Sequence, residues 1–483
     1  MDRRQFLAGT AAFAGGVSLS GNGFAQAPLL TVASRQIEVK RKAAKVFGII
    51  GAGGKHGVFA QEGDLFRGAV LNNTADPLVL HWHGQIYAPA EQDRARTGGG
   101  ALAAGASDMH DFRLTPGTHW MHSHTLTEQQ LLAAPLVTRE KDAGDVQDVV
   151  VMLHDFSFRP PEELLAGLGG ANVHAGHGAG HGTPAAAPAP NPHAGHAGHG
   201  GGHGGGQGAM GHGAGAVHAN DIAYDAYLAN DRTLDDPEVV RVEKNGKVRL
   251  RIINGATATA FFIDTGTLGA ECVAVDGSAC KPHAGRRFPL AQGQRIDLVV
   301  RIPAAGGAFP VFAQVEADRR LTGIVLATEG AAIRKFSDRA EHAAKHTDLS
   351  LDAALTALHP LPPKPGARVE HIMLAEEPGY RWTINGKIHG EHTPIAAKVG
   401  ERVEFMFMNP TAMMHPMHLH GHHFQVVGTR GGRFAGPVRD TVIVPPHTPV
   451  IVAVDFDKPG SWYLHCHHLY HMATGMMTEV IVT

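Results

Sequence analysis

Short stretches in which apolar and polar side chains alternate recur along the chain, and each predicts a β-strand. They cover residues 37–40, 248–253, 295–302, 403–408, 442–444 and 450–456. Turn signals such as Asp276-Gly277 bound several of these stretches. Helical periodicity is weak, and residues 128–134 and 338–346 are its candidates. Many short strands separated by turns are typical of sandwiches and barrels, so the pattern predicts an all-β protein with minor helical content.

The chain repeats a pattern of turn, aromatic and histidine positions near its two ends. Residues 116–124 read PGTHWMHSH and residues 459–467 read PGSWYLHCH, so an H-x-H motif occupies the same place in both. Residues 81–84, HWHG, and 418–421, HLHG, form a second matching pair. Internal repetition of this kind indicates related structural units.

A third unit of similar form lies between them. In each outer unit the H-x-H motif begins nine residues after an asparagine, Asn72 or Asn409, that follows a largely apolar run. The run that ends at Asn254 is similar, but Ile263 and Thr265 stand where histidines would be. The length of 483 residues agrees with about three domains at roughly 150 residues each. We therefore predict three related β domains, at residues 28–145, 146–335 and 336–483, with histidine pairs only in the first and third.

Charge and composition exclude several classes of protein. The 42 basic and 45 acidic residues give a net charge of −3, which argues against nucleic-acid binding. No apolar run reaches the roughly 18 residues of a membrane span. Three cysteines, Cys272, Cys280 and Cys466, are too few for a disulfide scaffold or a four-cysteine zinc site. The unusual count is 34 histidines, which makes metal binding the first chemistry to test.

Residues 1–27 have the pattern of an export signal. The twin arginine at positions 3 and 4 precedes Phe6 and Leu7, and a weakly apolar stretch follows it. Residues 25–27 read AQA, a small-residue cleavage site. The pattern resembles a bacterial twin-arginine signal, with an ordinary Sec signal as the alternative. Both predict a mature protein outside the cytoplasm, in the periplasm or beyond.

Four H-x-H pairs, at 81/83, 122/124, 418/420 and 465/467, share one geometric property. Because residues i and i+2 of a strand share a face, each pair directs two imidazoles to one side. Eight imidazoles from two domains can hold several metal ions. Cys466 lies between His465 and His467 and points the other way. A thiolate with two imidazoles and a weak thioether is the blue-copper arrangement, and the nearby set His415, Cys466, His471 and Met476 supplies it.

This geometry connects the two groups of ligands. A copper bound by Cys466 would be linked through the backbone to the neighbouring ligands His465 and His467. Single electrons can then pass to a cluster that collects four of them and reduces O2 to water. We therefore predict catalytic roles for Cys466, His465 and His467.

The four motifs resemble the copper motifs of multicopper oxidases, a family that includes laccases, ascorbate oxidase, cuprous oxidases and copper-resistance oxidases. The resemblance rests on ten histidines and one cysteine in fixed spacing. It implies three tandem cupredoxin-like Greek-key β-sandwich domains that bind four copper ions. By position, it implies a type 1 copper on His415, Cys466, His471 and Met476, a type 2 copper on His81 and His418, and a type 3 pair on His83, His122, His124, His420, His465 and His467.

The family resemblance also points to an acid near the cluster. Many bacterial members carry Met-Asp-Gly shortly after H-W-H-G, and that aspartate is implicated in proton delivery. Here residues 91–94 read EQDR, so Asp93 is the counterpart although the glycine is missing. A solvated loop carboxylate is the alternative interpretation of Asp93.

Residues 171–218 form a Gly/Ala/Pro/His segment with nine histidines. Such a composition cannot bury a core and predicts disorder. Two interpretations stay open, a solvated loop and a copper-collecting arm, since neutral imidazoles bind Cu(II) well.

Cys272 and Cys280 lie outside the copper motifs, in a domain that we expect to be exported. Spacing alone does not decide their state. They form either a disulfide or two separate buried thiols.

These observations predict an exported laccase-like oxidase that couples one-electron oxidation of a substrate to four-electron reduction of O2. Phenols and metal ions such as Cu(I) are the candidate reducing substrates, and extra copper is a candidate partner of residues 171–218. The alternative function is a periplasmic copper-sequestering protein with incidental oxidase activity. The sequence carries no signal for oligomeric state.

Overall fold

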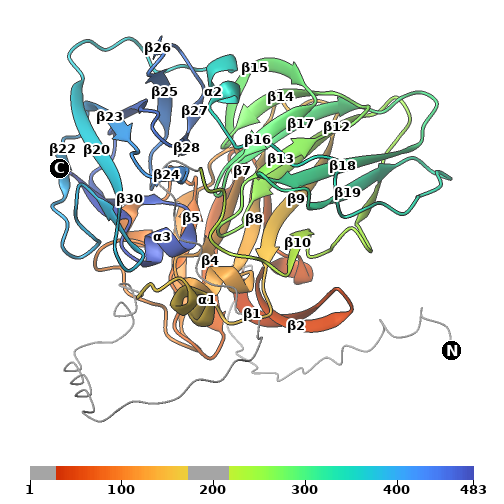
Figure 1. Cartoon of the computed structure of the whole chain (residues 1–483), viewed down its shortest axis with the longest axis horizontal. Coiled ribbons are helices and arrows are strands. Elements are labelled where there is room, and N and C mark those ends of the chain that lie inside the picture. Colours follow the sequence, from red (N-terminus) through yellow and green to blue (C-terminus); the bar gives the residue numbers. More distant parts are fainter. Residues whose placement is uncertain (1–28, 172–216) are drawn as a thin grey trace, which may run out of the picture.

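The computed structural model of the chain describes residues 29–171 and 217–483. The export signal expected at residues 1–27 and nearly all of the histidine-rich segment lie outside the described residues. Within the described ranges, the strands form six sheets that follow one another in three pairs (Figure 1). The predicted all-β class with three tandem sandwiches is therefore confirmed.

The first sandwich combines sheets of strand order β2-β1-β4-β6 and β3-β8-β7-β5. Its elements are β1 (Leu29–Val39), β2 (Lys42–Ile50), η2 (Ala52–Gly54), β3 (Val58–Gln61), β4 (Leu65–Asn73), β5 (Leu80–His83), η3 (Ala90–Gln92), β6 (Ser107–Arg113), β7 (Gly117–Ser123), η4 (Leu126–Gln130) and β8 (Ala133–Arg139). Strand β4 illustrates the pattern: Phe66 and Val70 are buried while Arg67 between them faces solvent. This alternation gives each sheet one apolar face for the core.

The second sandwich combines orders β10-β9-β12-β17-β14-β15 and β11-β19-β18-β13-β16. Its elements are β9 (Gln147–Phe156), α1 (Pro161–Gly167), β10 (Ala226–Ala229), β11 (Val239–Arg241), β12 (Lys247–Asn254), β13 (Phe261–Asp264), β14 (Ala270–Val275), β15 (Ser278–Gly285), β16 (Arg287–Leu290), β17 (Arg295–Arg301), β18 (Ala308–Val315) and β19 (Leu321–Ala327). Strand β12 is buried over nearly its whole length because the first sandwich covers part of this domain.

The third sandwich combines orders β21-β20-β23-β29-β25-β26, with β27 beside β25, and β22-β31-β30-β24-β28. Its elements are α2 (Ser350–Ala354), β20 (Arg368–Glu377), β21 (Arg381–Ile384), β22 (Ile395–Ala397), β23 (Arg402–Met408), β24 (His415–Leu419), β25 (Phe424–Thr429), β26 (Gly432–Arg433), β27 (Val438–Arg439), β28 (Thr441–Val444), β29 (Val450–Asp455), β30 (Gly460–Cys466), α3 (Leu469–Ala473) and β31 (Met477–Val482). The histidine motifs of this domain fall on β24, on β30 and at their ends.

One sheet of every domain repeats the same strand order. The runs β3-β8-β7-β5, β11-β19-β18-β13 and β22-β31-β30-β24 correspond to one another. Within the second of these, Ile263 lies on β13 and Thr265 follows that strand directly. The same strand order thus occurs three times, and the middle copy has the strand without a histidine pair.

A buried asparagine makes the same turn in each domain. Asn72, Asn254 and Asn409 each donate two side-chain hydrogen bonds of 2.7–3.0 Å to backbone carbonyls, one within the same turn and one on a more distant segment. The side-chain oxygen of each accepts a hydrogen bond from the backbone N–H two residues later. Because all of its hydrogen bonds are satisfied, each buried amide fixes the direction of the chain at its turn. In the outer domains the strand after this turn carries an H-x-H motif, and in the middle domain it is the corresponding strand.

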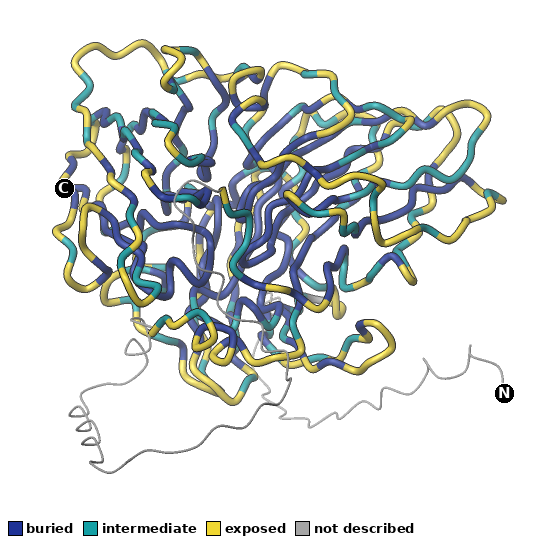
Figure 2. The backbone as a smooth tube through the Cα atoms, viewed as in Figure 1, coloured by how far each residue is buried: buried dark blue, intermediate teal, exposed yellow. Residues whose placement is uncertain are grey.

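Buried residues are concentrated where the sandwiches meet (Figure 2). Two arginines of the second domain make ion pairs there. Arg251 binds Glu140, at the end of the first domain, with a nitrogen–oxygen distance of 2.7 Å. Arg295 binds Asp440 of the third domain through two nitrogens, at 2.6 and 2.5 Å. These charge-assisted bonds fix both outer domains against the middle one.

Both helix predictions are wrong in detail. Residues 126–130 form a 3-10 helix that ends at Leu131, whose φ is +61°. Residues 338–346 form no helix, because Arg339 pairs with Arg320 and the Ala340 N–H binds the Arg319 carbonyl. This segment is extended along the turn between β18 and β19.

Cys272 and Cys280 are both buried and both free. They lie on the neighbouring strands β14 and β15, and the Cys280 sulfur is 3.7 Å from the Cys272 carbonyl oxygen. Of the two alternatives for these cysteines, the structure has thiols and no disulfide.

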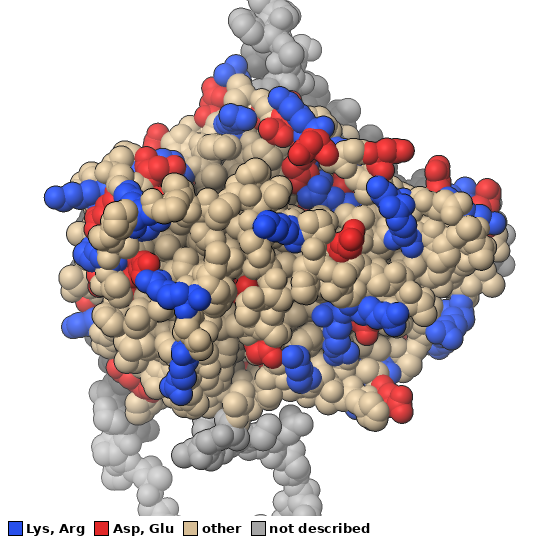
Figure 3. Space-filling view, turned by 90° about the horizontal axis from the view of Figure 1, so that it is seen from above, with Lys and Arg blue, Asp and Glu red and all other residues tan. Residues whose placement is uncertain are grey.

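The surface mixes charges of both signs. On the face drawn in Figure 3, basic and acidic side chains alternate without a large region of one sign. Among the described residues, no helix has both the length and the apolar character needed to cross a membrane.

Candidate copper centres

Strand register brings the histidines of each outer domain together. In the first domain, β5 and β7 are antiparallel and His81 lies opposite His122. In the third domain, β24 and β30 are antiparallel and His418 lies opposite His465. Residues directly opposite each other in such a pair project to the same face of the sheet. Each domain therefore presents a row of imidazoles.

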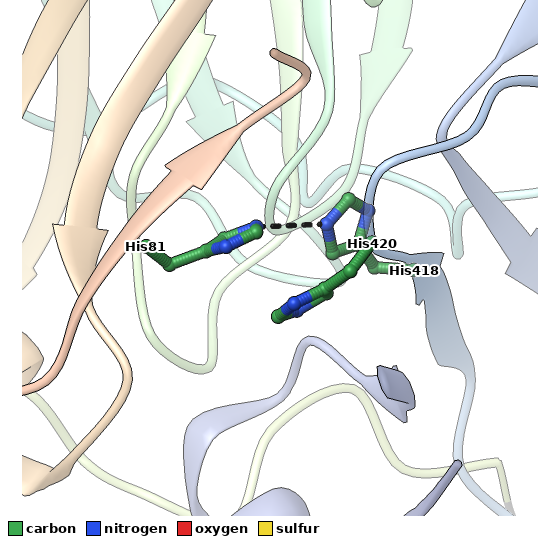
Figure 4. A group of neighbouring side chains, drawn as sticks. All are labelled: His81, His418 and His420. Carbon is green, nitrogen blue, oxygen red and sulfur yellow. Dashed lines mark hydrogen bonds between the residues drawn. The ribbon is translucent and has the colours of Figure 1, made fainter. Parts of the chain in front are cut away.

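The two rows meet in one buried cluster. The Nε2 atoms of His81 and His418 lie 3.2 Å apart, with His420 stacked on His81 (Figure 4). The Nε2 atom of His465 lies 3.2 Å from that of His124 and 3.0 Å from that of His420. All eight histidines of the four H-x-H pairs are buried. Residues more than 330 positions apart thus form a single site.

The protonation of this cluster fits a metal site. Burial lowers the pKa of His83, His418, His420 and His467 well below its ordinary value, so these imidazoles are neutral at pH 7. A neutral imidazole keeps a lone pair for a metal ion. The buried Nε2 atom of His467 has no hydrogen-bond partner among the described residues. An array of facing imidazole nitrogens matches the preference of copper ions.

Three buried or nearly buried carboxylates contact histidines of the cluster on the side away from it. The contacts are Asp93 Oδ2 to His81 Nδ1 at 2.7 Å, Glu128 Oε2 to His122 Nδ1 at 3.0 Å, and Asp440 Oδ1 to His83 Nε2 at 3.1 Å. Such contacts fix the tautomer and the ring orientation of a metal ligand. Because its Nε2 faces Asp440, His83 presents Nδ1 to the cluster, 3.3 Å from His122 Nε2.

A second, smaller site forms around Cys466. Its sulfur lies 3.6 Å from His415 Nδ1 and 3.7 Å from His471 Nδ1, and these two nitrogens are 3.2 Å apart. All three side chains are fully buried, and burial raises the pKa of the Cys466 thiol. Met476 is also fully buried, and its carbonyl accepts a hydrogen bond from the Cys466 N–H. This is the triangle of one sulfur and two imidazole nitrogens that a blue copper requires.

The two sites share one stretch of backbone. Cys466 is the last residue of β30, and its neighbours His465 and His467 belong to the large cluster. The alternation of side chains along the strand directs the thiol to one side and the imidazoles to the other. The chain provides a covalent path from the Cys466 site to the cluster.

The outer side of the Cys466 site is lined by aromatic and acidic groups. The Trp382 ring stacks on His471 with 3.9 Å between centroids. Asp221 Oδ2 lies 3.3 Å from His471 Nε2 and accepts a hydrogen bond from the Tyr380 hydroxyl at 2.6 Å. The His471 ring therefore lies between Cys466, which its Nδ1 faces, and the Asp221 carboxylate, which its Nε2 faces.

The structure brings the sequence-derived site residues into two groups, as the spacing suggested. His81, His83, His122, His124, His418, His420, His465 and His467 form the large cluster. His415, Cys466 and His471 form the small one, with Met476 beside them, and Asp93 contacts His81. Sequence reasoning missed Glu128, Asp221, Trp382 and Asp440. Each lies outside a recognisable motif, and only tertiary contacts connect it to a ligand.

Three family models described as multicopper oxidase match the chain, at residues 31–142, 198–331 and 362–483. Together they span most of its length, and the outer two contain all the clustered histidines. The chain belongs to the multicopper oxidase family. As a multicopper oxidase it is an oxidoreductase with copper cofactors that uses O2 to oxidise a reducing substrate.

Curated relatives of this multicopper oxidase cover nearly the same span. The chain is 28% identical over 429 residues to the multicopper oxidase MmcO of Mycobacterium tuberculosis, covering 87% of this chain and 80% of the relative. It is 23% identical over 519 residues to a copper resistance protein A homolog of Pseudomonas syringae pv. tomato, covering 87% and 86%.

Solved structures of other multicopper oxidases share the fold. The laccase from Botrytis aclada aligns with a TM-score of 0.73 at 20% identity, covering 94% of this chain and 87% of that one. McoA from Aquifex aeolicus aligns with a TM-score of 0.67 at 20% identity, covering 95% and 96%. The three sandwiches are therefore cupredoxin domains in tandem.

Proposed function

We propose that this multicopper oxidase holds four copper ions and takes single electrons from a small substrate beside His471. The observation that carries the proposal is the position of Cys466. Its sulfur faces His415 and His471, while its two chain neighbours face the large cluster. An oxidase needs such a connection between the place where electrons are donated and the place where O2 is reduced, whereas a storage protein does not. The sequestration alternative is therefore not favoured.

The ligand roles follow the two groups. His415, Cys466, His471 and Met476 would hold type 1 copper, His81 and His418 type 2 copper, and His83, His122, His124, His420, His465 and His467 the type 3 pair. Bound copper would supply one-electron transfer and the four-electron reduction of O2 to water. The protein's part is to keep the imidazoles neutral, exclude bulk water and hold the ligand geometry fixed.

Metal content and oxygen uptake test this proposal together. We expect four coppers per chain, a blue absorbance band, and oxygen consumption with a reducing donor. Cys466→Ser should remove the blue band and one copper and reduce turnover by at least a hundredfold, because the substituted oxygen neither forms the type 1 site nor carries electrons from it. Full turnover in Cys466→Ser would contradict the assignment.

We infer that Asp93 supplies protons to the large cluster. Its Oδ2 contacts His81 Nδ1, its Oδ1 accepts the Ala95 N–H, and its side chain is 11% exposed, which leaves a route to solvent. Asp93→Asn should lower kcat by about a hundredfold to ten-thousandfold, since general acid–base catalysis contributes factors of about 10²–10⁴. Anaerobic reduction of the blue band by the donor should keep its wild-type rate. Loss of that rate instead would assign Asp93 to another step.

We infer that the donor binds against Asp221, which suits a cation such as Cu(I) and also accepts a phenol hydroxyl. Oxygen uptake with Cu(I) and with a methoxyphenol as separate donors ranks these classes. Asp221→Asn should raise KM for Cu(I) more than tenfold, because the carboxylate charge attracts this cation. The rise in KM for the neutral phenol should be smaller, because the phenol carries no charge. The exposed Asp235→Asn is the matched control, with no change for either donor.

The histidine-rich segment between residues 171 and 218 suits a copper-collecting role in this scheme. Its described flanks both reach the outer side of the Cys466 site. Gly170 lies so close to Thr474 that a Cβ atom would be 2.8 Å from the threonine methyl group, and the His218 N–H donates to the Ala412 carbonyl at 3.0 Å. Replacing the nine histidines should slow copper loading at limiting metal and leave turnover of the loaded enzyme intact. An unchanged loading curve would refute this role.

Export through a twin-arginine signal completes the proposal. The arginine pair at positions 3 and 4 and the small-residue site at 25–27 support it. Replacing both arginines by lysine should retain the enzyme in the cytoplasm, measured by fractionation and immunoblotting. Continued export of that variant would favour the Sec alternative.

A further inference from the structure

A cavity of about 240 Å³ lies between the first and second domains, apart from both copper centres. Phe59 and Pro135 of the first domain form part of its wall. The other side is the face of β9 that carries Val150, Met152 and His154, which share that face because they are two residues apart. Strand β9 is labelled in Figure 1, with β10 beside it.

Two histidines line this cavity. His154 Nδ1 donates to the Gly255 carbonyl at 3.0 Å, so its proton is on Nδ1 and its lone pair is on Nε2. This is the tautomer of a metal ligand that is fixed by a backbone carbonyl. The buried Nε2 atom of His56 has no hydrogen-bond partner among the described residues.

An acidic turn completes the cavity lining. Asn230 and Asp231 follow β10 with φ of +49° and +66°, a backbone conformation that these two residue types tolerate. Arg35 binds both carboxylate oxygens of Asp231, at 2.5 and 2.9 Å, and thereby orients the group. Asn230 is held by the backbone of β9 through its hydrogen bonds to Met152 and Val150. The turn is rigid, and Asp231 stays in the cavity wall.

The groups around the cavity are electron-pair donors with no net positive charge. Burial, and secondarily Arg35, lowers the pKa of His56 to about 4, and burial lowers the pKa of His154 to about 4. Both rings are therefore neutral at pH 7. Asp231 balances the charge of Arg35, so the groups that remain are two imidazole lone pairs, carboxylate oxygens and the Met152 thioether. All of these are electron-pair donors.

We propose that this cavity is a further metal site, which binds one imidazole-preferring divalent ion, Zn²⁺ or Cu²⁺, through His56 Nε2, His154 Nε2 and the Asp231 carboxylate. Imidazole and carboxylate ligands suit both ions. The site spans a domain interface, so a bound ion would tie β9 to the segment between η2 and β3. It contains none of the residues of the Cys466 site or the large cluster.

Crystals of the copper-loaded full-length protein, soaked in Zn²⁺ and measured at the zinc absorption edge, test the position directly. We expect an anomalous peak about 2.0–2.1 Å from His56 Nε2 and His154 Nε2, the usual zinc–nitrogen distance. A parallel Cu²⁺ soak at the copper edge decides which ion is preferred. Absence of a peak in the cavity with both ions would overturn the proposal.

Metal stoichiometry in solution gives an independent test, and comparison with variants separates zinc in the cavity from zinc on other histidines of the chain. His56→Ala/His154→Ala should bind one Zn²⁺ fewer per chain than the wild type at saturation, while keeping its blue band and copper content. The exposed His371→Ala, on β20, should bind as many as the wild type. If the double variant does not fold, the single variant His56→Ala should bind the zinc ion in the cavity at least tenfold more weakly than the wild type. Equal zinc content and affinity in wild type and variants would refute the site.

Discussion

At the residue scale, Asp440 joins three domains through one carboxylate. It belongs to the third domain, orients His83 of the first, and binds Arg295 of the second through both oxygens. Burial acts to raise its pKa, but Arg295, together with His423 and His119, holds the pKa below the ordinary value. The carboxylate is therefore ionised at neutral pH and neutralises an arginine that is fully buried.

Asp440→Asn should destabilise the protein strongly. Removing one member of a buried ion pair leaves an uncompensated charge, which costs about 3–5 kcal/mol. Urea unfolding of the copper-free protein measures the loss. Asp455→Asn is the control, because Asp455 pairs with Arg402 at a side-chain exposure of 29% and should cost about 1 kcal/mol or less. Equal losses of unfolding free energy in the two variants would mean that the buried Asp440 ion pair stabilises the protein no more than the partly exposed Asp455 pair does.

His119 gives a prediction about pH. It is fully buried, and burial, with Arg295 second, lowers its pKa to about 3. The unfolded chain binds this proton near pH 6.5, so its contribution to stability is complete above pH 6.5 and is lost as pH falls toward 3. Between pH 6 and 4 the copper-free wild type should lose about 1 kcal/mol more per pH unit than His119→Gln. Urea unfolding at each pH gives the free energy of unfolding of both proteins. The same pH dependence in the wild type and in His119→Gln would contradict the prediction.

At the element scale, the turn after β24 positions the third-domain ligands. Gly421 has φ of +65°, and a Cβ atom there would lie 2.1 Å from a Trp462 ring carbon. Only glycine fits both the backbone conformation and the ring. This explains why the H-x-H motif of the third domain ends in glycine: the turn must pass Trp462 of β30 directly after His420.

Gly421→Ala should therefore reduce copper binding as well as stability. The shift of Trp462 moves β30, and with it His465, so copper content should fall below that of the wild type. Gly100→Ala is the matched control, with φ of +66° and no atom within 4 Å of the added Cβ. It should cost only about 1–2 kcal/mol of backbone strain and keep all its copper. Copper analysis and thermal unfolding of Gly421→Ala and Gly100→Ala test this prediction. Equal copper content in the two variants would exclude a clash with Trp462 as the cause.

The strands were predictable at this scale, and the helices were not. Alternation along residues 403–408 corresponds to β23, because one face of that strand packs in the core. The short helix α3, which carries His471, and helix α1 have too few turns to show a period in the sequence. Residues 338–346 were a helix candidate, but contacts with the β18–β19 turn keep them extended.

At the scale of the whole molecule, the cluster is an interface between domains. Its histidines lie on or directly after β5 and β7 on one side and β24 and β30 on the other, while the described part of the middle domain contributes Arg295 and no histidine. Copper bound there would connect the first and third domains directly. Ligand binding that requires the docked arrangement stabilises that arrangement.

Removal of copper should loosen this interface first. Hydrogen exchange should speed up in β5 and β24 of the copper-free protein, while β13, the corresponding strand without ligands, keeps its protection. The melting temperature should fall, because a ligand at a hundredfold excess over its Kd contributes about 2.7 kcal/mol. Restoring copper should reverse both changes. Equal acceleration in β13 would indicate global loosening instead.

The sequence by itself determined the strand pattern, the threefold repeat and which histidines, with Cys466, are the candidates for binding copper. These are local properties: the two-residue period of a strand decides that His465 and His467 point one way and Cys466 the other. Tertiary structure alone decided what surrounds the ligands. Asp440, Glu128 and Asp221 reach His83, His122 and His471 from positions 357, 6 and 250 residues away, and Arg295 then fixes Asp440. Hydrogen bonds and desolvation depend on distance in space, so no pattern along the chain encodes them.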